Sequence, residues 1–158
     1  MSCPSTGPDA VTINDTLYST FMNGVGGTAK CYFSKASMNT VALTSVAPLT
    51  GSIPGLTQQN FPRIASHGSA LAIVWKQVVS GNTLLPVLFT NDISNGLPSV
   101  YDTVDLNNIT NADVALSNGN IYVVWQDDGS QTVKFRYGTF IPVSTGIISS
   151  NQNEKQEV

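Results

Sequence analysis

The residues best suited to chemistry are two neighbouring carboxylates, Asp127 and Asp128, followed by Gly129. Two carboxylates could share the acid and base roles in the hydrolysis of a glycosidic bond, and carboxylate oxygens could hold Ca²⁺. Asp92 is a third aspartate at an expected loop position, so a hydrolytic pair would draw on different sheets. Asp-Gly is, however, a strong hairpin signal. We therefore expect Asp127 and Asp128 to shape a turn, with binding of a ligand or of Ca²⁺ as the alternatives.

The remaining reactive residues do not form a known catalytic arrangement. The single histidine, His67, precedes Gly68 in an expected turn, where a histidine is usually solvated. No phosphate-binding glycine loop, zinc spacing or serine-histidine-aspartate set is present in the sequence. Cys3 and Cys31 could form a disulfide or could remain free thiols. We predict no catalytic residue, no cofactor and, apart from the Ca²⁺ alternative, no metal site.

The elements that must position these residues form a repeat. Three windows align without a gap: Gly7–Phe21, Phe61–Trp75 and Asn111–Trp125. Each contains a short apolar segment, a turn and a longer apolar segment that ends in Phe21, Trp75 or Trp125. A spacing of about 50 residues is typical of propellers and solenoids. We interpret the three terminal aromatic residues as structural anchors between the repeats.

Each repeat is expected to form four antiparallel strands, because the apolar runs are short, β-branched or aromatic, and separated by turn residues. The expected strands of the first repeat are Asp9–Ile13, Thr16–Met22, Ala29–Ser34 and about Thr40–Val46. Those of the second repeat are Arg63–Ser66, Ala70–Val78, Leu84–Thr90 and about Val100–Asp105. Those of the third repeat are Asp113–Leu116, Asn120–Trp125, Thr132–Tyr137 and about Thr139–Val143. The segments Gln58–Pro62 and Asn107–Asn111 are expected to be loops that enter the first strands.

The second strands are apolar on both faces, which is typical of sheets covered on both sides. Four-stranded sheets that repeat at this spacing and stack face to face are the blades of a β-propeller. A single β-sandwich is the alternative. We predict an all-β chain with three four-stranded antiparallel blades, half of a six-bladed propeller, at about 3–50, 58–107 and 108–143, followed by a polar tail at 144–158.

One position is charged in all three windows, where Asp9, Arg63 and Asp113 are equivalent. The start of each first strand lies near the axis of a propeller, where ligands often bind. These three side chains could therefore bind a ligand, or they could form hydrogen bonds with the loop backbone.

Composition excludes several classes of partner. The net charge is −3 and only 11% of residues are charged, against about 25% in typical proteins. Because no basic stripe exists, we expect no binding to nucleic acid. No apolar run is long enough to span a membrane. The abundance of Ser, Thr and Asn suits a secreted or cell-surface protein, although no signal peptide is found in this chain.

Two segments resemble a known family. NADVALSNGNIYVVWQDDGSQTVKFRYG, residues 111–138, is similar to repeats of the sialidase-like β-propeller superfamily, which includes the BNR or Asp-box proteins. CPSTGPDAVTINDTLYSTFMNG, residues 3–24, resembles a repeat of secreted bacterial members. The resemblance implies a propeller fold and secretion. The Asp-box itself is incomplete at Thr90–Gly96, where no tryptophan follows.

Sialidases hold the carboxylate of their substrate with three arginines and also use a tyrosine, a glutamate and an aspartate. This chain has two arginines, Arg63 and Arg136, and its glutamates, Glu154 and Glu157, lie in the tail. The resemblance therefore implies a non-catalytic extracellular segment that binds a glycan or a protein. The alternatives are a glycoside hydrolase fragment whose arginines lie outside this chain, and a structural spacer in a surface protein.

Three blades leave two apolar faces uncovered, whereas closed propellers usually have four to eight blades. We expect the ring to be completed either by the remainder of a longer propeller chain or by a second copy of the chain in a homodimer.

Overall fold

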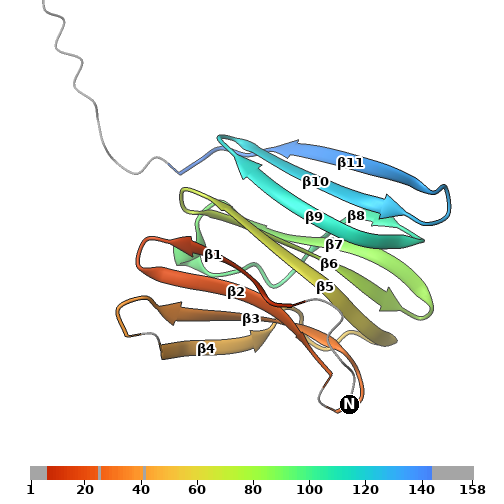
Figure 1. The fold of residues 1–158 in the computed structure, drawn as a ribbon, viewed down its shortest axis with the longest axis horizontal. Coiled ribbons are helices and arrows are strands. Elements are labelled where there is room, and N and C mark those ends of the chain that lie inside the picture. The colour runs from red at the N-terminus through yellow and green to blue at the C-terminus, as the bar shows by residue number, and fades with distance from the viewer. Residues whose placement is uncertain (1–6, 25, 41, 144–158) are drawn as a thin grey trace, which may run out of the picture.

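The structure is a computed structural model that describes residues 7–24, 26–40 and 42–143. These residues form three antiparallel sheets (Figure 1). Sheet 1 contains β1 (Asp9–Ile13), β2 (Thr16–Asn23), β3 (Lys30–Ser37) and β4 (Ala42–Pro48). Sheet 2 contains β5 (Leu56–His67), β6 (Ala70–Val79), β7 (Asn82–Thr90) and β8 (Asp102–Leu106), with the 3₁₀ turn η1 (Ile93–Asn95) between the last two strands. Sheet 3 contains β9 (Ile109–Ser117), β10 (Asn120–Asp127) and β11 (Thr132–Thr139).

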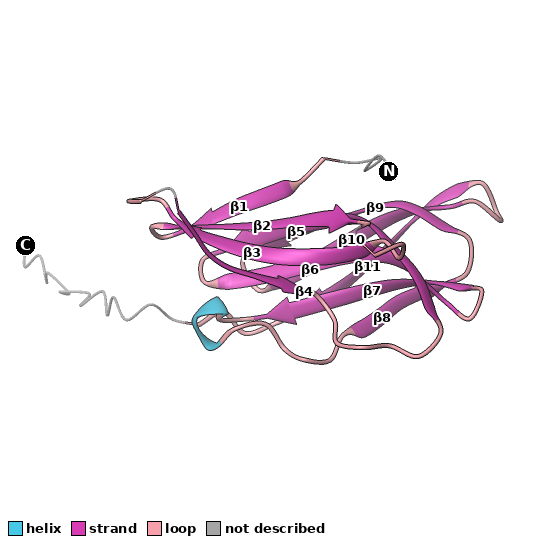
Figure 2. Ribbon diagram, turned by 90° about the horizontal axis from the view of Figure 1, so that it is seen from below, coloured by secondary structure: helices cyan, strands magenta, loops and turns pink. Residues whose placement is uncertain are grey.

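The three sheets are stacked face to face, with sheet 2 in the middle (Figures 1 and 2). Their strands follow one another in chain order within each sheet. The first strand of sheet 2, β5, contacts the first strands of both neighbours, β1 and β9. This stack of sheets with adjacent first strands is a blade-like arrangement, as the repeat predicted.

Strand registers confirm the alignment of the three windows. Val11 pairs with Tyr18, Ala65 pairs with Ala72, and Ala115 pairs with Tyr122. All three pairs occupy the same two positions of the aligned windows. Residues at equivalent positions therefore lie on equivalent faces of the three sheets, because the side chains of a strand alternate between its faces.

The expected loops before the first strands of sheets 2 and 3 are wrong, because both strands begin earlier. β5 starts at Leu56 and β9 starts at Ile109. The register of each strand pair shifts close to Phe61 and Asn111, which have positive φ angles of 53° and 50°. Both residues open their windows, so a bulge recurs at one position. A bulge absorbs an extra residue and lets the strand continue, which is difficult to distinguish from a loop in the sequence.

Sheet 3 has three described strands instead of the four that we predicted. β11 ends at Thr139, and the residues at 140–143 form no strand. Phe140 instead crosses toward sheet 2, where its ring lies 4.9 Å from the ring of Phe89. Pro142 follows closely and has no N–H to donate to a neighbouring strand, which disfavours a fourth ladder.

Two apolar clusters fill the spaces between the sheets. Between sheets 1 and 2, Leu71, Ile73 and Trp75 are completely buried. Between sheets 2 and 3, Ala72 and Val74 pack in a cluster with Trp125, which is 3% exposed. The two faces of β6 therefore serve two different clusters, which explains its continuous apolar sequence.

Phe21, the third expected anchor, has different surroundings. It is partly buried, pairs with Tyr32 across sheet 1, and stacks on that ring at 5.6 Å. Strand alternation places both rings on the side of sheet 1 that faces away from sheet 2. No described sheet covers this side.

A buried polar network joins sheets 1 and 2 beside Trp75. The side chain of Gln59 accepts the N–H of Cys31 at 3.1 Å and donates to Gln77 at 2.7 Å. Gln77 accepts the indole N–H of Trp75 at 3.1 Å and donates to the hydroxyl of Tyr101 at 2.8 Å. Because every link has a partner, the network avoids the cost of an unsatisfied buried polar group.

Candidate functional site

Asp9 connects two sheets through their backbones. Its carboxylate accepts the N–H of Ala10 and the N–H of Ile64 in β5, each at 3.0 Å. Ala10 and Ile64 occupy equivalent window positions. The contact therefore ties the beginning of sheet 1 to the beginning of sheet 2 through the backbone of strands, whereas the alternative that we considered was a bond with loop backbone.

Asp113 and Arg63 do not join Asp9 in a common site. The carboxylate of Asp113 accepts the N–H of the next residue, Val114, at 2.9 Å. Arg63 pairs with Val74 and lies on the side of sheet 2 that faces sheet 3. Among the described residues, no hydrogen bond or ion pair links these three charged side chains. Ligand binding by this set stays a prediction.

Asp127 and Asp128 are engaged in their own hairpin. Asp127 accepts the N–H groups of Gly129 at 2.9 Å and Ser130 at 3.0 Å, and forms an ion pair with Lys134 on β11. Asp128 accepts hydrogen bonds from the hydroxyl of Thr110 and from Gln126. No group of three or more His, Cys, Asp or Glu side chains that could hold a metal ion occurs within the described part of the chain.

Lys134 also connects this hairpin to sheet 2. Its ammonium lies 3.8 Å from the carboxylate of Asp105 in β8, which accepts the indole N–H of Trp125 at 2.9 Å. The role of Asp105 could not be predicted from the sequence, because its partners are close only after sheets 2 and 3 have packed.

The ion pair gives a testable titration. The hydrogen bond from Lys134, with the N–H groups of Ser130 and Gly129, lowers the pKa of Asp127 to about 2. The lowered pKa means that this contribution to stability is complete above the ordinary carboxylate range and is lost as the pH falls toward 2. In an NMR titration we expect the midpoint of Asp127 near pH 2, and a higher midpoint, still below its ordinary value of 3.8, in Lys134→Ala, because the N–H groups of Ser130 and Gly129 remain. Lys30→Ala, in sheet 1, should leave it unchanged. An unshifted midpoint in the native protein would contradict the ion pair.

Cys31 is a free thiol that is completely buried in β3, and burial raises its pKa. Cys3, its possible disulfide partner, lies outside the described residues. His67 is exposed at the end of β5, as expected of a turn histidine. No described helix is long and apolar enough to cross a membrane.

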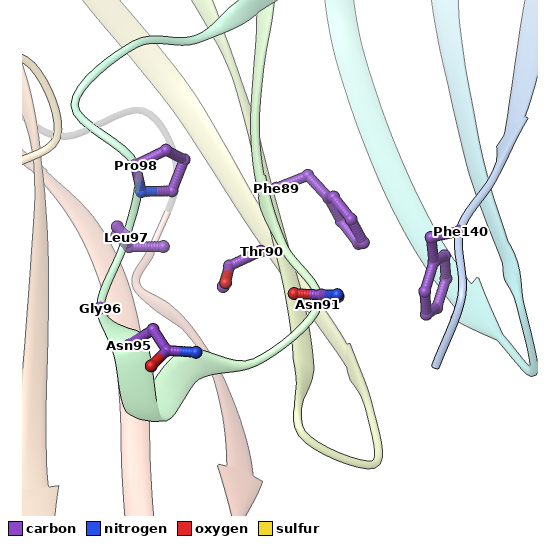
Figure 3. A pocket seen from close by; sticks show the side chains of 8 residues that line it. All are labelled: Phe89, Thr90, Asn91, Asn95, Gly96, Leu97, Pro98 and Phe140. Atoms are coloured by element: carbon purple, nitrogen blue, oxygen red, sulfur yellow. The ribbon is translucent and has the colours of Figure 1, made fainter. Parts of the chain in front are cut away.

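A groove of about 340 Å³ lies at the end of β7 (Figure 3). The end of β7, with Phe89, Thr90 and Asn91, lies between the loop of residues 95–98 on one side and Phe140 on the other, and the ring of Phe89 points toward Phe140. Phe140 approaches from the segment after β11. The volume of the groove is within the range of small-ligand sites. A second hollow, of about 510 Å³, shares Leu97 and Pro98 with the groove and extends toward sheet 1.

The loop wall is held in place by the segment that resembles an incomplete Asp-box. Asp92 caps η1 by accepting the N–H of Ser94 at 3.0 Å, and Thr90 donates to the carbonyl of Asp92 at 2.9 Å. Ile93 is buried, and its N–H bonds to the carbonyl of Ser69 at 2.9 Å. These hydrogen bonds and the burial of Ile93 fix the direction in which the chain leaves β7 toward the groove wall.

The groove combines aromatic rings with uncommitted amides. Phe89 and Phe140 supply two tilted rings, with an angle of 53° between their planes. The carboxamides of Asn91 and Asn95 are exposed, and neither forms a hydrogen bond with another described residue. Among the described residues, no charged side chain lines the groove. Carboxamides both donate and accept, so they suit hydroxyl groups, whereas the rings suit an apolar surface of the same ligand.

The groove lies at the opposite end of the sheets from the start of the first strands and from the Asp127–Asp128 turn, where ligand binding was considered. It is formed at the end where β7 stops and β11 leaves its sheet. The long loop rich in Asn, Gly and Pro at 91–98 was the available signal. Phe140 could not be identified, because it was assigned to a fourth strand.

No family model matches the sequence, and no curated protein matches it. Among solved structures, the chain is similar to one described as a mutant of Trypanosoma rangeli sialidase displaying trans-sialidase activity, with a TM-score of 0.46 and 10% identity over 84% of this chain and 30% of that one. It is also similar to a glycoside hydrolase, with a TM-score of 0.43 and 11% identity over 96% of this chain and 58% of that one. The chain thus spans less than two thirds of either structure.

Proposed function

We propose that this chain is a non-catalytic segment of an extracellular sialidase-like β-propeller, and that it binds a neutral glycan in the groove beside Phe89 and Phe140. The observation that carries the proposal is the uncharged groove itself, with two aromatic rings and two carboxamides that have no other described partner. A pyranose offers apolar C–H faces together with hydroxyl groups, and the groove matches both. The low content of charged residues supports an extracellular setting.

The arrangement of the carboxylates supports binding without turnover. Hydrolysis of a glycosidic bond requires two carboxylates on opposite sides of the bond. None of the described residues that line the groove carries a carboxylate. Asp127 and Asp128 hold their own hairpin, and Asp9 holds the backbone of the next sheet.

Binding should depend on the groove side chains. In a screen of neutral oligosaccharides followed by calorimetry, we expect Asn95→Ala and Phe140→Ala each to weaken binding about tenfold, the loss expected for one hydrogen-bonding group or one stacked ring. Asn39→Ala is the matched control, because Asn39 is exposed in the turn between β3 and β4, outside the groove.

Two outcomes would count against the proposal. Equal binding by Asn95→Ala, Phe140→Ala and the native chain would place the ligand elsewhere. Turnover of fluorogenic glycosides by the purified chain would show that it is an enzyme, since the proposal expects none.

A further inference from the structure

The outer side of sheet 3 is an exposed apolar surface, which we call the trailing face. It is formed by residues of β10 and β11 that share the side facing away from sheet 2: Tyr122, which pairs with Tyr137, Val124, which pairs with Phe135, and Val133, which pairs with Gln126. Val133 and Phe135 are 75% and 74% exposed. Asp113 lies at the β9 edge of this face, where its carboxylate is bonded to the N–H of Val114. A face of this kind on a protein in water usually has a partner.

The equivalent face of sheet 2 is buried, which shows what such a face accommodates. In sheet 2, Ala72 pairs with Phe89 and Val74 pairs with Val87, as Tyr122 pairs with Tyr137 and Val124 with Phe135 in sheet 3. Ala72 and Val74 are 0% exposed, because this face packs against sheet 3. The trailing face of sheet 3 is therefore equivalent to the face of sheet 2 that forms one side of the interface between sheets 2 and 3.

The outer side of sheet 1 is equivalent to the other side of this interface, and we call it the leading face. It contains Leu17 and Phe21 on β2, and Tyr32 opposite Phe21 on β3. Leu17 and Phe21 are equivalent to Leu71 and Trp75 of sheet 2, which pack against the preceding sheet. Leu17, Phe21 and Tyr32 are only partly buried.

We propose that the trailing face of one chain binds the leading face of a second copy of the same chain. The contact would continue the interface found between sheets 1 and 2 and between sheets 2 and 3. Two copies related by a twofold axis would satisfy both faces of each chain at once, giving six stacked sheets, a number within the range of closed rings. This proposal does not depend on glycan binding, since no residue of the groove belongs to either face.

The first test is the mass of the 158-residue chain in solution. By light scattering coupled to size exclusion, and by analytical ultracentrifugation at micromolar concentration, we expect twice the mass of one chain. Phe135→Lys and Val133→Lys should each raise the dissociation constant at least about tenfold, because the contact would have to bury an unpaired charge. Val100→Lys is the matched control, since Val100 is 76% exposed in the loop before β8. Circular dichroism verifies that each variant is folded. A monomeric native chain would overturn the proposal.

The second test concerns the orientation of the two copies. A head-to-tail contact requires both faces, so Phe21→Lys should also dissociate the dimer. Mixing Phe21→Lys with Phe135→Lys should restore association, because one of the two contacts then retains two native faces. If Phe21→Lys remains dimeric, or if folded Phe135→Lys and Val133→Lys associate like the native chain, the proposed interface is wrong.

Discussion

Replacing Trp75 by alanine is expected to lower the free energy of unfolding by about 3–5 kcal/mol, the cost of deleting a large aromatic side chain from a packed core. Trp75 is 0% exposed, and its ring meets that of Tyr101 edge to face at 5.6 Å. Its indole N–H also donates to Gln77. Because a domain of this size is stabilised by only about 5–15 kcal/mol in total, the variant should be close to unfolding.

Urea denaturation followed by circular dichroism would measure this loss. Trp75→Phe keeps a ring but removes the indole N–H, so it should cost less than Trp75→Ala. Val100→Ala should change stability by no more than about 0.5 kcal/mol, because Val100 is exposed. A loss below about 1 kcal/mol in Trp75→Ala would show that Trp75 is not an anchor between sheets 1 and 2.

Replacing Gln59 by leucine should cost about 2–3 kcal/mol, because its side chain supports several buried groups at once. Gln59 is 1% exposed, accepts the N–H of Cys31, and donates to Thr50 at 2.9 Å and to Gln77. Leucine has a similar size but offers none of these bonds. The N–H of Cys31 would then be buried without the acceptor that it has in the native protein, and such a group loses the energy of its hydration without compensation.

The neighbouring Gln58 provides a matched control for this substitution. It is exposed on β5, so Gln58→Leu should change the unfolding free energy by no more than about 0.5 kcal/mol. Comparable losses in Gln58→Leu and Gln59→Leu, measured by the same urea titration, would indicate an effect of strand propensity and would argue against a role for the buried network.

The repeat itself could be predicted because it depends on local properties of the chain. The β1–β2 turn, the alternation of apolar residues and the aromatic residue that ends the second strand recur at a constant spacing, and backbone pairing preserves that spacing. The bounds of β1, Asp9–Ile13, agree with the expected strand, since a tight turn directly follows it.

The early starts of β5 and β9 could not be predicted in the same way. A residue at positive φ, such as Phe61 or Asn111, resembles a loop residue in sequence, but the neighbouring strand supplies enough pairing to continue through the bulge. The missing fourth strand of sheet 3 has a similar cause. Thr139, Phe140, Ile141 and Val143 are residues typical of a strand, but packing of Phe140 near Phe89 and the missing N–H of Pro142 keep this segment out of the ladder.

The groove shows the limit of prediction most clearly. Phe89 and Phe140 are far apart in sequence and belong to different repeats, so their proximity depends on how sheet 3 lies against sheet 2. The sequence by itself determined the all-β class, the three repeats and the acidic hairpin at Asp127, because these follow from turn chemistry and alternation within a few residues. The tertiary structure alone decided which side chains share a groove, which amides lack partners and which apolar faces stay open, because these depend on contacts between sheets.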